Sequence, residues 1–572
     1  MTVNRDKQNI EFIAKYRAAI ESKLSREEFA EYMDVLPRSV IKRRLLIEKN
    51  TGMRLKILET DPTFNGGIDP DKLVKFELLY EKYLVKEAGP SNIDISSPNK
   101  KQVFVYTAAQ NATPIHENFW ATLLKYKEIR NAELGVIPYR YKNPNSIWTD
   151  KKHDWWFTGL GEYLVTDQTK VCKGLNVLAQ IKITPTATTP LSGFEAFTGS
   201  DSGIFGHPKV QLKTIATPNK KMPKIQVTTG ACTIENYTDS KAGHKGRFHH
   251  SCSALIVEID DDKFHIRHVH AADDGSFYDL EYHYTPHGRT KYGRVAAFIS
   301  GDLHAEFIDT DVENATFKGD DSIVGVLRPE VMVYQDADDF YRRNHHHRGN
   351  DIIAYGKHHF GRNNVEEGLQ ITADFIDKYT RPDTLNLVTA ANHNEAFDRW
   401  LLENDPKYDP ENSLFFYYMK YMQMKNIKPT ATGFKTFSAF EFWCKNPMPE
   451  GKPGLKSVEQ TKFLQRDESF MVADVEIGFH GDERINGGGG GLAAFSKIGP
   501  KVVIGHSHSP GIIEGAYQTG LSARLDLEYQ RGPSSWLHTH CLVYPDGSRT
   551  LINVINGEWR ASYYDREYEI SK

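Results

Sequence analysis

Metal-ligating side chains follow five apolar runs in the second half of the chain. The runs, near residues 294–300, 331–334, 385–389, 475–479 and 501–504, have the composition of buried strands. Each is followed by a short polar group: Asp302 with His304, Asp336 with Asp339, Asn392 with His393, His480 with Asp482, and His506 with His508. Such mixtures of carboxylate, amide and imidazole suit borderline divalent ions such as Mn²⁺, Fe²⁺ or Zn²⁺.

The elements that carry these groups explain how they could meet. Open α/β sheets place their ligand sites at the carboxyl ends of their strands. Asp302 and His304 are two residues apart, as are His506 and His508, so each pair points to one side of an extended segment. The sequence therefore predicts one metal site to which five separate segments contribute.

Taken in order, the five groups resemble the motifs of the calcineurin-like metallophosphoesterase superfamily, which includes the Mre11-type nucleases. The family pattern is D-x-H, G-D-x-x-D, G-N-H-D/E, a histidine before glycine, and G-H-x-H, and the resemblance covers residues 290–560. It implies an α/β protein whose C-terminal part is a metallophosphoesterase β-sandwich flanked by helices. It also implies two bound divalent ions, with Mn²⁺ expected and Mg²⁺, Fe²⁺ or Zn²⁺ as alternatives.

The resemblance also assigns roles to single residues. Asp302, His304 and His508 would bind the first ion; Asn392, His480 and His506 would bind the second; Asp336 would bridge the two. His393 would be the catalytic group beside the scissile phosphate. Two such ions lower the pKa of bound water and neutralise charge on the phosphoryl oxygens.

The third motif departs from the family pattern beside the catalytic histidine. Asn394 stands where an acid usually orients the preceding histidine, and Ala391 replaces a glycine. In the second motif, Gln335 also replaces a glycine. An amide can accept a hydrogen bond from His393 but does not raise its basicity as a carboxylate would. His393 is therefore predicted to lack its usual orienting acid.

A basic segment after the second motif is a candidate for contacts with substrate phosphate. It consists of Arg342, Arg343, His345, His346, His347 and Arg348. The alternative is a solvated basic loop.

The first sixty residues resemble a helix-turn-helix. Ser25 and Glu28 form a capping box, a turn follows at 34–37, and a basic helix is predicted from about 38 to 49. Arg38, Lys42, Arg43 and Arg44 are the candidate DNA contacts. The alternative is a helical bundle used for packing or assembly.

These patterns divide the chain into four regions. We expect an all-α helix-turn-helix-like module at 1–60, a helical linker at 61–100, a mixed α/β to β-rich accessory region at 101–285, and the catalytic domain at 286–572. A buried strand is predicted at 102–107 and a helix at 115–130. No internal repeat is apparent.

Composition excludes several classes of protein. The 572 residues carry a net charge of −4, which excludes a generic basic nucleic-acid coat. No apolar run approaches the roughly 20 residues of a membrane-spanning helix, and the N-terminus has no apolar signal core, so we expect a cytoplasmic protein without a membrane segment.

The function predicted from these observations is metal-dependent hydrolysis of DNA. The longer pattern His480-Gly481-Asp482, Asn486-Gly487, Gly505-His506-Ser507-His508 and Gly532-Pro533-Ser534 is similar to a family of early proteins of T5-like phages. That family is linked to host-DNA degradation and first-step DNA transfer, which implies the host cytoplasm. Mre11-like enzymes commonly assemble, so a homo-oligomer is expected. The alternatives are a phosphomonoesterase or protein phosphatase, and a non-catalytic DNA-binding regulator.

Overall fold

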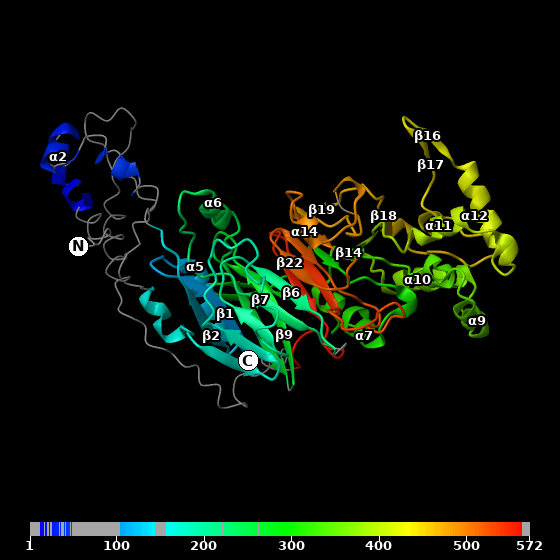
Figure 1. The fold of residues 1–572 in the computed structure, drawn as a ribbon, viewed down its shortest axis with the longest axis horizontal. Coiled ribbons are helices and arrows are strands. Elements are labelled where there is room, and N and C mark those ends of the chain that lie inside the picture. Colours follow the sequence, from blue (N-terminus) through cyan, green and yellow to red (C-terminus); the bar gives the residue numbers. More distant parts are fainter. Residues whose placement is uncertain are drawn as a thin grey trace.

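The computed structural model describes residues 103–143, 156–218, 222–260, 262–483 and 485–562, and parts of 12–47. It is a mixed α/β protein with several sheets (Figure 1). No helix of the described part is long and apolar enough to cross a membrane.

Two short helical stretches agree with the predictions for the N-terminal module. Helix α2 (Arg26–Tyr32) begins directly after the predicted capping serine, and the described residues between 39 and 47 are helical. Phe12, Tyr16 and Phe29 are buried against one another, with ring centroids 5.3–5.7 Å apart. The helix predicted within 61–100 lies outside the described residues.

The largest sheet has ten strands and runs through both halves of the chain. Its order is β19 (Met471–Val472), β20 (Val475–Glu476), β21 (Lys501–Ile504), β23 (Ala516–Gln518), β22 (Gly511–Ile513), β6 (Gln211–Ile215), β7 (Lys224–Thr228), β5 (Ser202–Phe205), β4 (Leu175–Leu178) and β3 (Gln168–Cys172).

Two further sheets face this one. The four-stranded sheet contains β2 (Glu133–Tyr139), β1 (Val103–Gln110), β8 (Ser253–Asp260) and β9 (Lys263–His270). The six-stranded sheet contains β18 (Thr461–Phe463), β15 (Leu385–Val388), β14 (Val331–Tyr334), β13 (Ala297–Ile299), β24 (Thr539–Val543) and β25 (Arg549–Asn553). Strand β25 lies beside β9, so the two sheets together cover the ten-stranded one.

Apolar side chains from all three sheets form one core between the layers. Val257 and Ile299 of the smaller sheets share this core with Val227 and Val503 of the ten-stranded sheet. The outer faces of the smaller sheets are covered by α5 (Glu117–Ile129), α7 (Thr310–Phe317), α8 (Ile323–Leu327), α10 (Val365–Tyr379), α11 (Ala396–Glu403), α12 (Ser413–Lys425) and α13 (Ala439–Lys445).

The remaining elements are short. They are α6 (Lys241–Phe248), α9 (Asp351–His359), α14 (Leu492–Phe495), a sheet of β10 (Phe277–Asp279), β11 (Tyr282–Thr285) and β12 (Gly288–Lys291), and a hairpin of β16 (Lys428–Thr430) and β17 (Gly433–Lys435). Helices α9 to α12 and the hairpin lie at one end of the molecule, beyond the six-stranded sheet (Figure 1).

The two halves of the chain repeat one arrangement of nine strands. The order β2-β1-β8-β9 in the first half matches β14-β13-β24-β25 in the second, with parallel and antiparallel neighbours in the same places. In the ten-stranded sheet, β3-β4-β5-β7-β6 matches β19-β20-β21-β23-β22 in the same way. The antiparallel pair of β6 and β22 joins the halves.

This repeat corrects the expectation that the sequence contains none. Corresponding backbone hydrogen bonds link the strands: Thr229 donates to Phe205 over 3.2 Å, and Thr519 donates to Ile504 over 2.9 Å. Few residue identities survive, chiefly a Gly-His pair after β5 and after β21 and a Thr-Gly pair after β7 and after β23. The halves meet near the predicted boundary at 285–286, but they share one sheet.

The strand ends that carry the predicted ligands come from both layers of the second half. Strands β13, β14 and β15 are parallel neighbours in the six-stranded sheet. Strands β20 and β21 are parallel neighbours in the opposite sheet. Because the two sheets face each other, residues that follow these five strands can meet at one end of the sandwich.

Candidate metal centre

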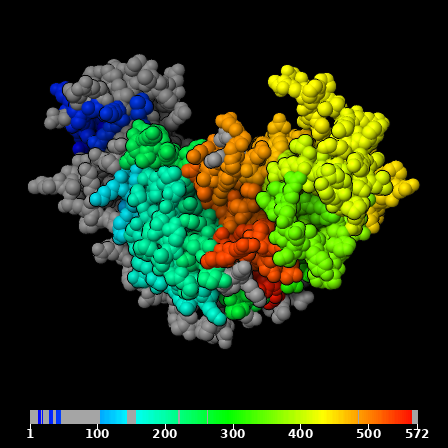
Figure 2. Space-filling view, turned by 45° about the vertical axis from the view of Figure 1, so that its right-hand side comes forward, coloured from blue at the N-terminus to red at the C-terminus, as the bar shows by residue number. Residues whose placement is uncertain are grey.

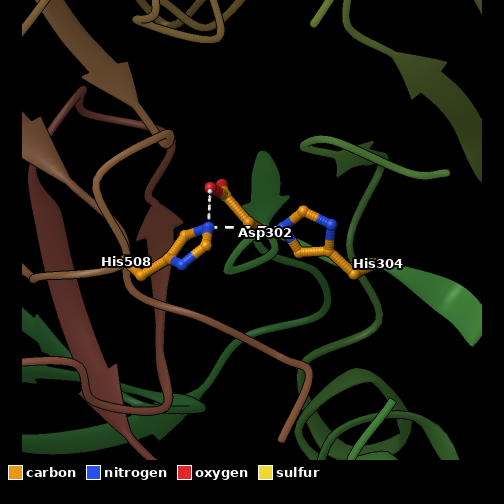
Figure 3. A group of neighbouring side chains, drawn as sticks. All are labelled: Asp302, His304 and His508. Atoms are coloured by element: carbon orange, nitrogen blue, oxygen red, sulfur yellow. Dashed lines mark hydrogen bonds and ion pairs between the residues drawn. The ribbon is translucent and has the colours of Figure 1, made fainter. Parts of the chain in front are cut away.

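Asp302, His304 and His508 form the most compact group of metal-binding side chains (Figure 3). The Nε2 atom of His508 lies 3.1 Å from Oδ2 of Asp302 and 3.3 Å from Nε2 of His304. All three side chains are buried. Two imidazole nitrogens that face each other beside a carboxylate provide the lone pairs that a divalent ion requires.

Asp336 and His480 complete a second group with Asp302. Oδ2 of Asp336 lies 3.6 Å from Nε2 of His480 and 3.8 Å from Nε2 of His304. Asp336 therefore lies between the two groups, where the bridging ligand was predicted. Among the described residues, its Oδ1 atom and Nε2 of His480 are buried without a hydrogen-bond partner, and such orphan atoms are costly unless something binds them. The residues present thus fit a bound cation.

The charges within this cluster are strongly coupled. Burial opposes ionisation of Asp302, but His480, His508 and His304 hold its pKa well below the usual range. Burial would also lower the pKa of His304, yet Asp339 and Asp336 raise it to about 9. Burial lowers the pKa of His508, which favours the neutral imidazole that metals bind.

Asp339 and Gln335 orient three of the histidines. Oδ2 of Asp339 lies 3.0 Å from Nδ1 of His304, and its backbone carbonyl lies 3.2 Å from Nδ1 of His393. Oε1 of Gln335 accepts a hydrogen bond of 2.9 Å from Nδ1 of His480. In each histidine the other ring nitrogen is directed at the ligand cluster, as is usual where a partner fixes the tautomer of a metal ligand.

Asn394 does not take the place of the acid that usually orients the catalytic histidine. Its Oδ1 atom accepts a hydrogen bond from the backbone N–H of Asp338, and its Nδ2 atom donates to the carbonyl of Thr389. The side chain is buried and ties two ligand-bearing loops together. Nδ1 of His393 instead bonds the backbone carbonyl of Asp339, and Oδ2 of Asp339 lies 3.7 Å away. The group that holds His393 is therefore a backbone carbonyl rather than a hydrogen-bonded carboxylate.

Asn392 and His506 border the cluster at its open side. Asn392 is exposed, and it lines a cleft of about 920 Å³ together with His393, Arg399, Lys435 and Arg466. The cleft lies between the segment around Asp482 and the lobe that contains α11 and β17, where the surface is hollowed (Figure 2). The His506 ring is 5.4 Å from that of His480, and its backbone N–H donates to Asp302.

Arg466 is a residue of this site that no local pattern marked. It donates to both oxygens of Asp482, with Nη1 to Oδ2 at 2.6 Å, and from Nη2 to Glu395 over 2.8 Å. The guanidinium therefore joins the loops that follow β15 and β20. Only the three-dimensional convergence of these loops reveals it.

Gly505 allows the first metal-binding group to form. A Cβ atom at this position would lie 2.2 Å from Oδ1 of Asp302, far inside van der Waals contact.

His540 supports the turn that carries Asp302. It accepts a hydrogen bond of 2.9 Å from the backbone N–H of Gly301 and contacts Thr316. His540 is thus structural, as is His538, which bonds the carbonyl of Ala523.

Gly505→Ala is expected to weaken binding of Mn²⁺ by at least about tenfold, because the new methyl group must displace the Asp302 carboxylate. Isothermal titration of the folded variant with Mn²⁺ measures this. Gly356→Ala on α9 is the matched control, since its Cβ meets nothing within 4 Å. Equal affinity in Gly505→Ala and wild type would remove Asp302 from the ligand set.

The basic segment after β14 is placed differently from the phosphate-binding loop that was expected. Arg342 is buried and lies 3.3 Å from Glu306 and 3.2 Å from Glu367. Arg343 forms a two-pronged pair with Asp409. These two arginines are held by carboxylates within the fold, so the structure argues against their role as phosphate contacts.

The histidines of the same segment and Arg348 lie nearer the surface. His345 bonds Arg399, His347 bonds Lys357, and Arg348 pairs with Glu403. His346 is exposed and lines the clefts on both sides of His393. Of the six candidates, His346 is therefore the best placed for a substrate.

The candidate DNA contacts of the N-terminal module differ among themselves. Lys42 is exposed, whereas the guanidinium carbon of Arg43 lies 5.1 Å from the ring centroid of Phe12. Arg44 is only 2% exposed, so its side chain is not available to a DNA backbone. Arg38 lies outside the described residues.

Comparison with known proteins supplies one relative. Protein A1 of Escherichia phage T5 is 31% identical over 475 residues, which make up 80% of this chain and 83% of the relative. The chain belongs to the protein A1 family. No family model matches it, and no solved structure matches it.

In this A1-family chain, the metal-binding groups found among the described residues all lie in the second half. The corresponding strand ends of the first half carry Gln110 as the last residue of β1 and Asn111 after it, Arg140 after β2, Gln180 after β4, and His207 and Lys209 after β5. Of these, His207 keeps the residue type of its counterpart, His506. The Nζ atom of Lys182 bonds the carbonyls of Pro138, near the end of β2, and of Ala179, directly after β4.

Proposed function

We propose that this chain is a metal-dependent nuclease that hydrolyses phosphodiester bonds of DNA with two divalent ions, Mn²⁺ being the expected ion. One observation carries the proposal: the ends of five strands bring aspartates and histidines together, most of them buried, and two of their polar atoms lack a hydrogen-bond partner among the described residues. The resemblance of these motifs to metallophosphoesterases supports it. A phage-encoded relative is consistent with action on host DNA in the host cytoplasm.

The residues of the chain would divide the work among them. Asp302, His304 and His508 would hold one ion and Asp336, His480, Asn392 and His506 the other, with Asp336 shared. The bound ions supply Lewis acidity and a deprotonated water at neutral pH. His393, held at Nδ1 by Asp339, presents Nε2 towards Asp336 at 3.9 Å and would donate a proton or hydrogen bond to the leaving oxygen.

Cations at the edge of the cleft would receive the rest of the strand. Lys435 and Arg399 lie on the same cleft as Asn392 and His393, and Arg399 is exposed. Such side chains neutralise phosphates and fix the register of a nucleic acid without reading its sequence. The same cleft is also lined by carboxylates, among them Glu403, Asp467 and Glu483, so it would suit a polyanionic substrate only once cations are bound.

The purified protein with Mn²⁺ is expected to shorten linear DNA or nick plasmid, and to lose this activity in chelator. The assay includes supercoiled plasmid, linear duplex, a single-stranded oligonucleotide and a chromogenic phosphomonoester. Hydrolysis of the monoester with all DNA intact would replace the nuclease with a phosphomonoesterase. DNA binding without hydrolysis of any substrate would favour a non-catalytic regulator.

A further inference from the structure

A second cavity opens on the other side of His393. It encloses about 380 Å³, within the range of sites for small organic ligands. Phe307, Tyr341 and Tyr529 supply aromatic wall, and Asp339 and His393 connect it to the metal centre. His393 is proposed to contact the scissile phosphate, and this aromatic cavity lies beside it. Aromatic ring faces are not metal ligands, so the cavity calls for another role.

Tyr529 is the aromatic side chain of this cavity that offers an open face. It is 48% exposed, and its ring centroid lies 6.4 Å from those of His393 and His508. Trp536 supports it edge-on at 5.7 Å and in turn lies 4.5 Å from the ring of His508. The ring of Tyr529 is therefore fixed directly beside the proposed ligands.

Tyr341 and Phe307, which form another part of the cavity wall, already contact neighbouring side chains. Tyr341 lies 4.9 Å from Phe307, and Arg362 lies over both rings at 4.6 and 4.8 Å. The Tyr341 hydroxyl donates to Glu528 over 3.1 Å. Because these groups hold one another, this wall is preorganised, and a planar ligand would be received on the Tyr529 side.

Polar groups line the same chamber. Glu528 offers carboxylate oxygens, His346 an exposed imidazole and Arg531 an exposed guanidinium. A planar, partly apolar ligand with polar edges and a neighbouring anion matches this set of groups. A nucleobase has these properties, and aromatic side chains stack on bases of any sequence.

We infer that this cavity binds the nucleobase next to the scissile phosphodiester, with Tyr529 stacked on it. The inference rests on the proposed function and names its substrate: a DNA strand whose base is unpaired at the cleaved position. A base inside a duplex stack cannot enter a side chamber without leaving its partner. Single strands, frayed ends and gaps are therefore the preferred forms of DNA.

Tyr529→Ala is expected to raise the KM for a short single-stranded DNA about 5- to 100-fold with little change in kcat, as loss of one stacked base implies. Tyr529→Phe keeps the ring and should keep the KM of wild type. Tyr421→Ala removes a comparably exposed tyrosine from α12 and is the matched control. An unchanged KM in Tyr529→Ala overturns the inference.

An abasic residue placed next to the cleaved bond tests the same contact from the DNA side. It should raise the KM of wild type by a similar factor and add nothing further in Tyr529→Ala. An equal effect in both proteins would mean that the base is bound elsewhere.

Binding in Ca²⁺, followed by fluorescence anisotropy, separates the inference from the proposed function. Tighter binding of the intact than of the abasic strand, without cleavage in Mn²⁺, would reject the nuclease and keep the base site. Equal cleavage and equal binding of both strands would keep the nuclease and reject the base site. No binding of either strand and no cleavage would reject both.

Discussion

Asp336→Asn is expected to reduce phosphodiester hydrolysis by at least about 100-fold. Substitution of a residue that only hydrogen-bonds to a metal ligand already lowers metal affinity or activity about 10- to 100-fold, and Asp336 is a proposed ligand itself. The substitution keeps the shape of the side chain and removes its charge. Oδ2 of Asp336 lies 3.6 Å from His480 and 3.8 Å from His304, and Oδ1 is buried without a hydrogen-bond partner among the described residues. Asp302 belongs to both groups and Asp336 is the second carboxylate close to histidines of both, so the second ion would lose one of its two shared carboxylates.

Asp338→Asn provides the control for this experiment. Asp338 is also buried, but its oxygens accept hydrogen bonds from Thr372 and from the backbone N–H of Phe340. Burial raises its pKa to about 7, so an amide is a mild replacement. Activity and Mn²⁺ content should survive in Asp338→Asn. Full activity in Asp336→Asn, with a normal unfolding transition, would contradict the bridging role.

Buried neutral histidines are expected to lower the stability of the metal-free protein between pH 6.5 and 5. Burial lowers the pKa of His207 and of His268 to about 4 and that of His540 to about 3. Near pH 6.5 these residues begin to bind protons in the unfolded chain but not in the folded one, so stability falls as pH falls. At pH 5 the loss from these three residues is about 2 kcal/mol for each histidine and about 6 kcal/mol together. Burial raises the pKa of Asp338 and of Asp398 to about 7, so these carboxyls bind protons in the folded chain over the same range and offset part of the loss.

Urea unfolding in chelator at pH 7.5, 6 and 5 measures this loss. His268→Gln should keep the hydrogen bond to the carbonyl of Thr228 and reduce the slope by about 1.4 kcal/mol per pH unit. The raised pKa of His304 contributes no slope here, since its stabilisation is complete below pH 6.5. Equal pH dependence of the free energy of unfolding in His268→Gln and in wild type would contradict the burial of His268 as a neutral group.

The ligand-bearing strands could be predicted because their signals are local. A short apolar run followed by Asp302 and His304, or by His506 and His508, contains both the strand and its chemistry in one stretch of sequence. The structure confirms β13, β14, β15 and β21 at or near the predicted positions.

The partners of those residues could not be predicted because they come from distant segments. Arg342 is a typical phosphate-binding residue until Glu306 and Glu367 are placed beside it by folding. The group that holds Nδ1 of His393 is the backbone carbonyl of Asp339, 54 positions earlier, rather than the side chain of residue 394. The repeat escaped notice because strand order is kept by backbone pairing, while side chains such as Gln180 and His480 have diverged.

The pairing of β6 with β22 has a consequence for how the centre behaves on dilution. The two strands are linked through only three residue pairs, Gly511 with Lys213, Ile512 with Leu212, and Ile513 with Gln211. The halves also share an apolar core and the contact of β25 with β9, but as separate chains they would still dissociate as their concentration fell. Here both strands belong to one polypeptide, so the local concentration of one half around the other is fixed. The sheet that carries His480 and His506 is therefore equally complete in the first molecule synthesised and in a concentrated solution.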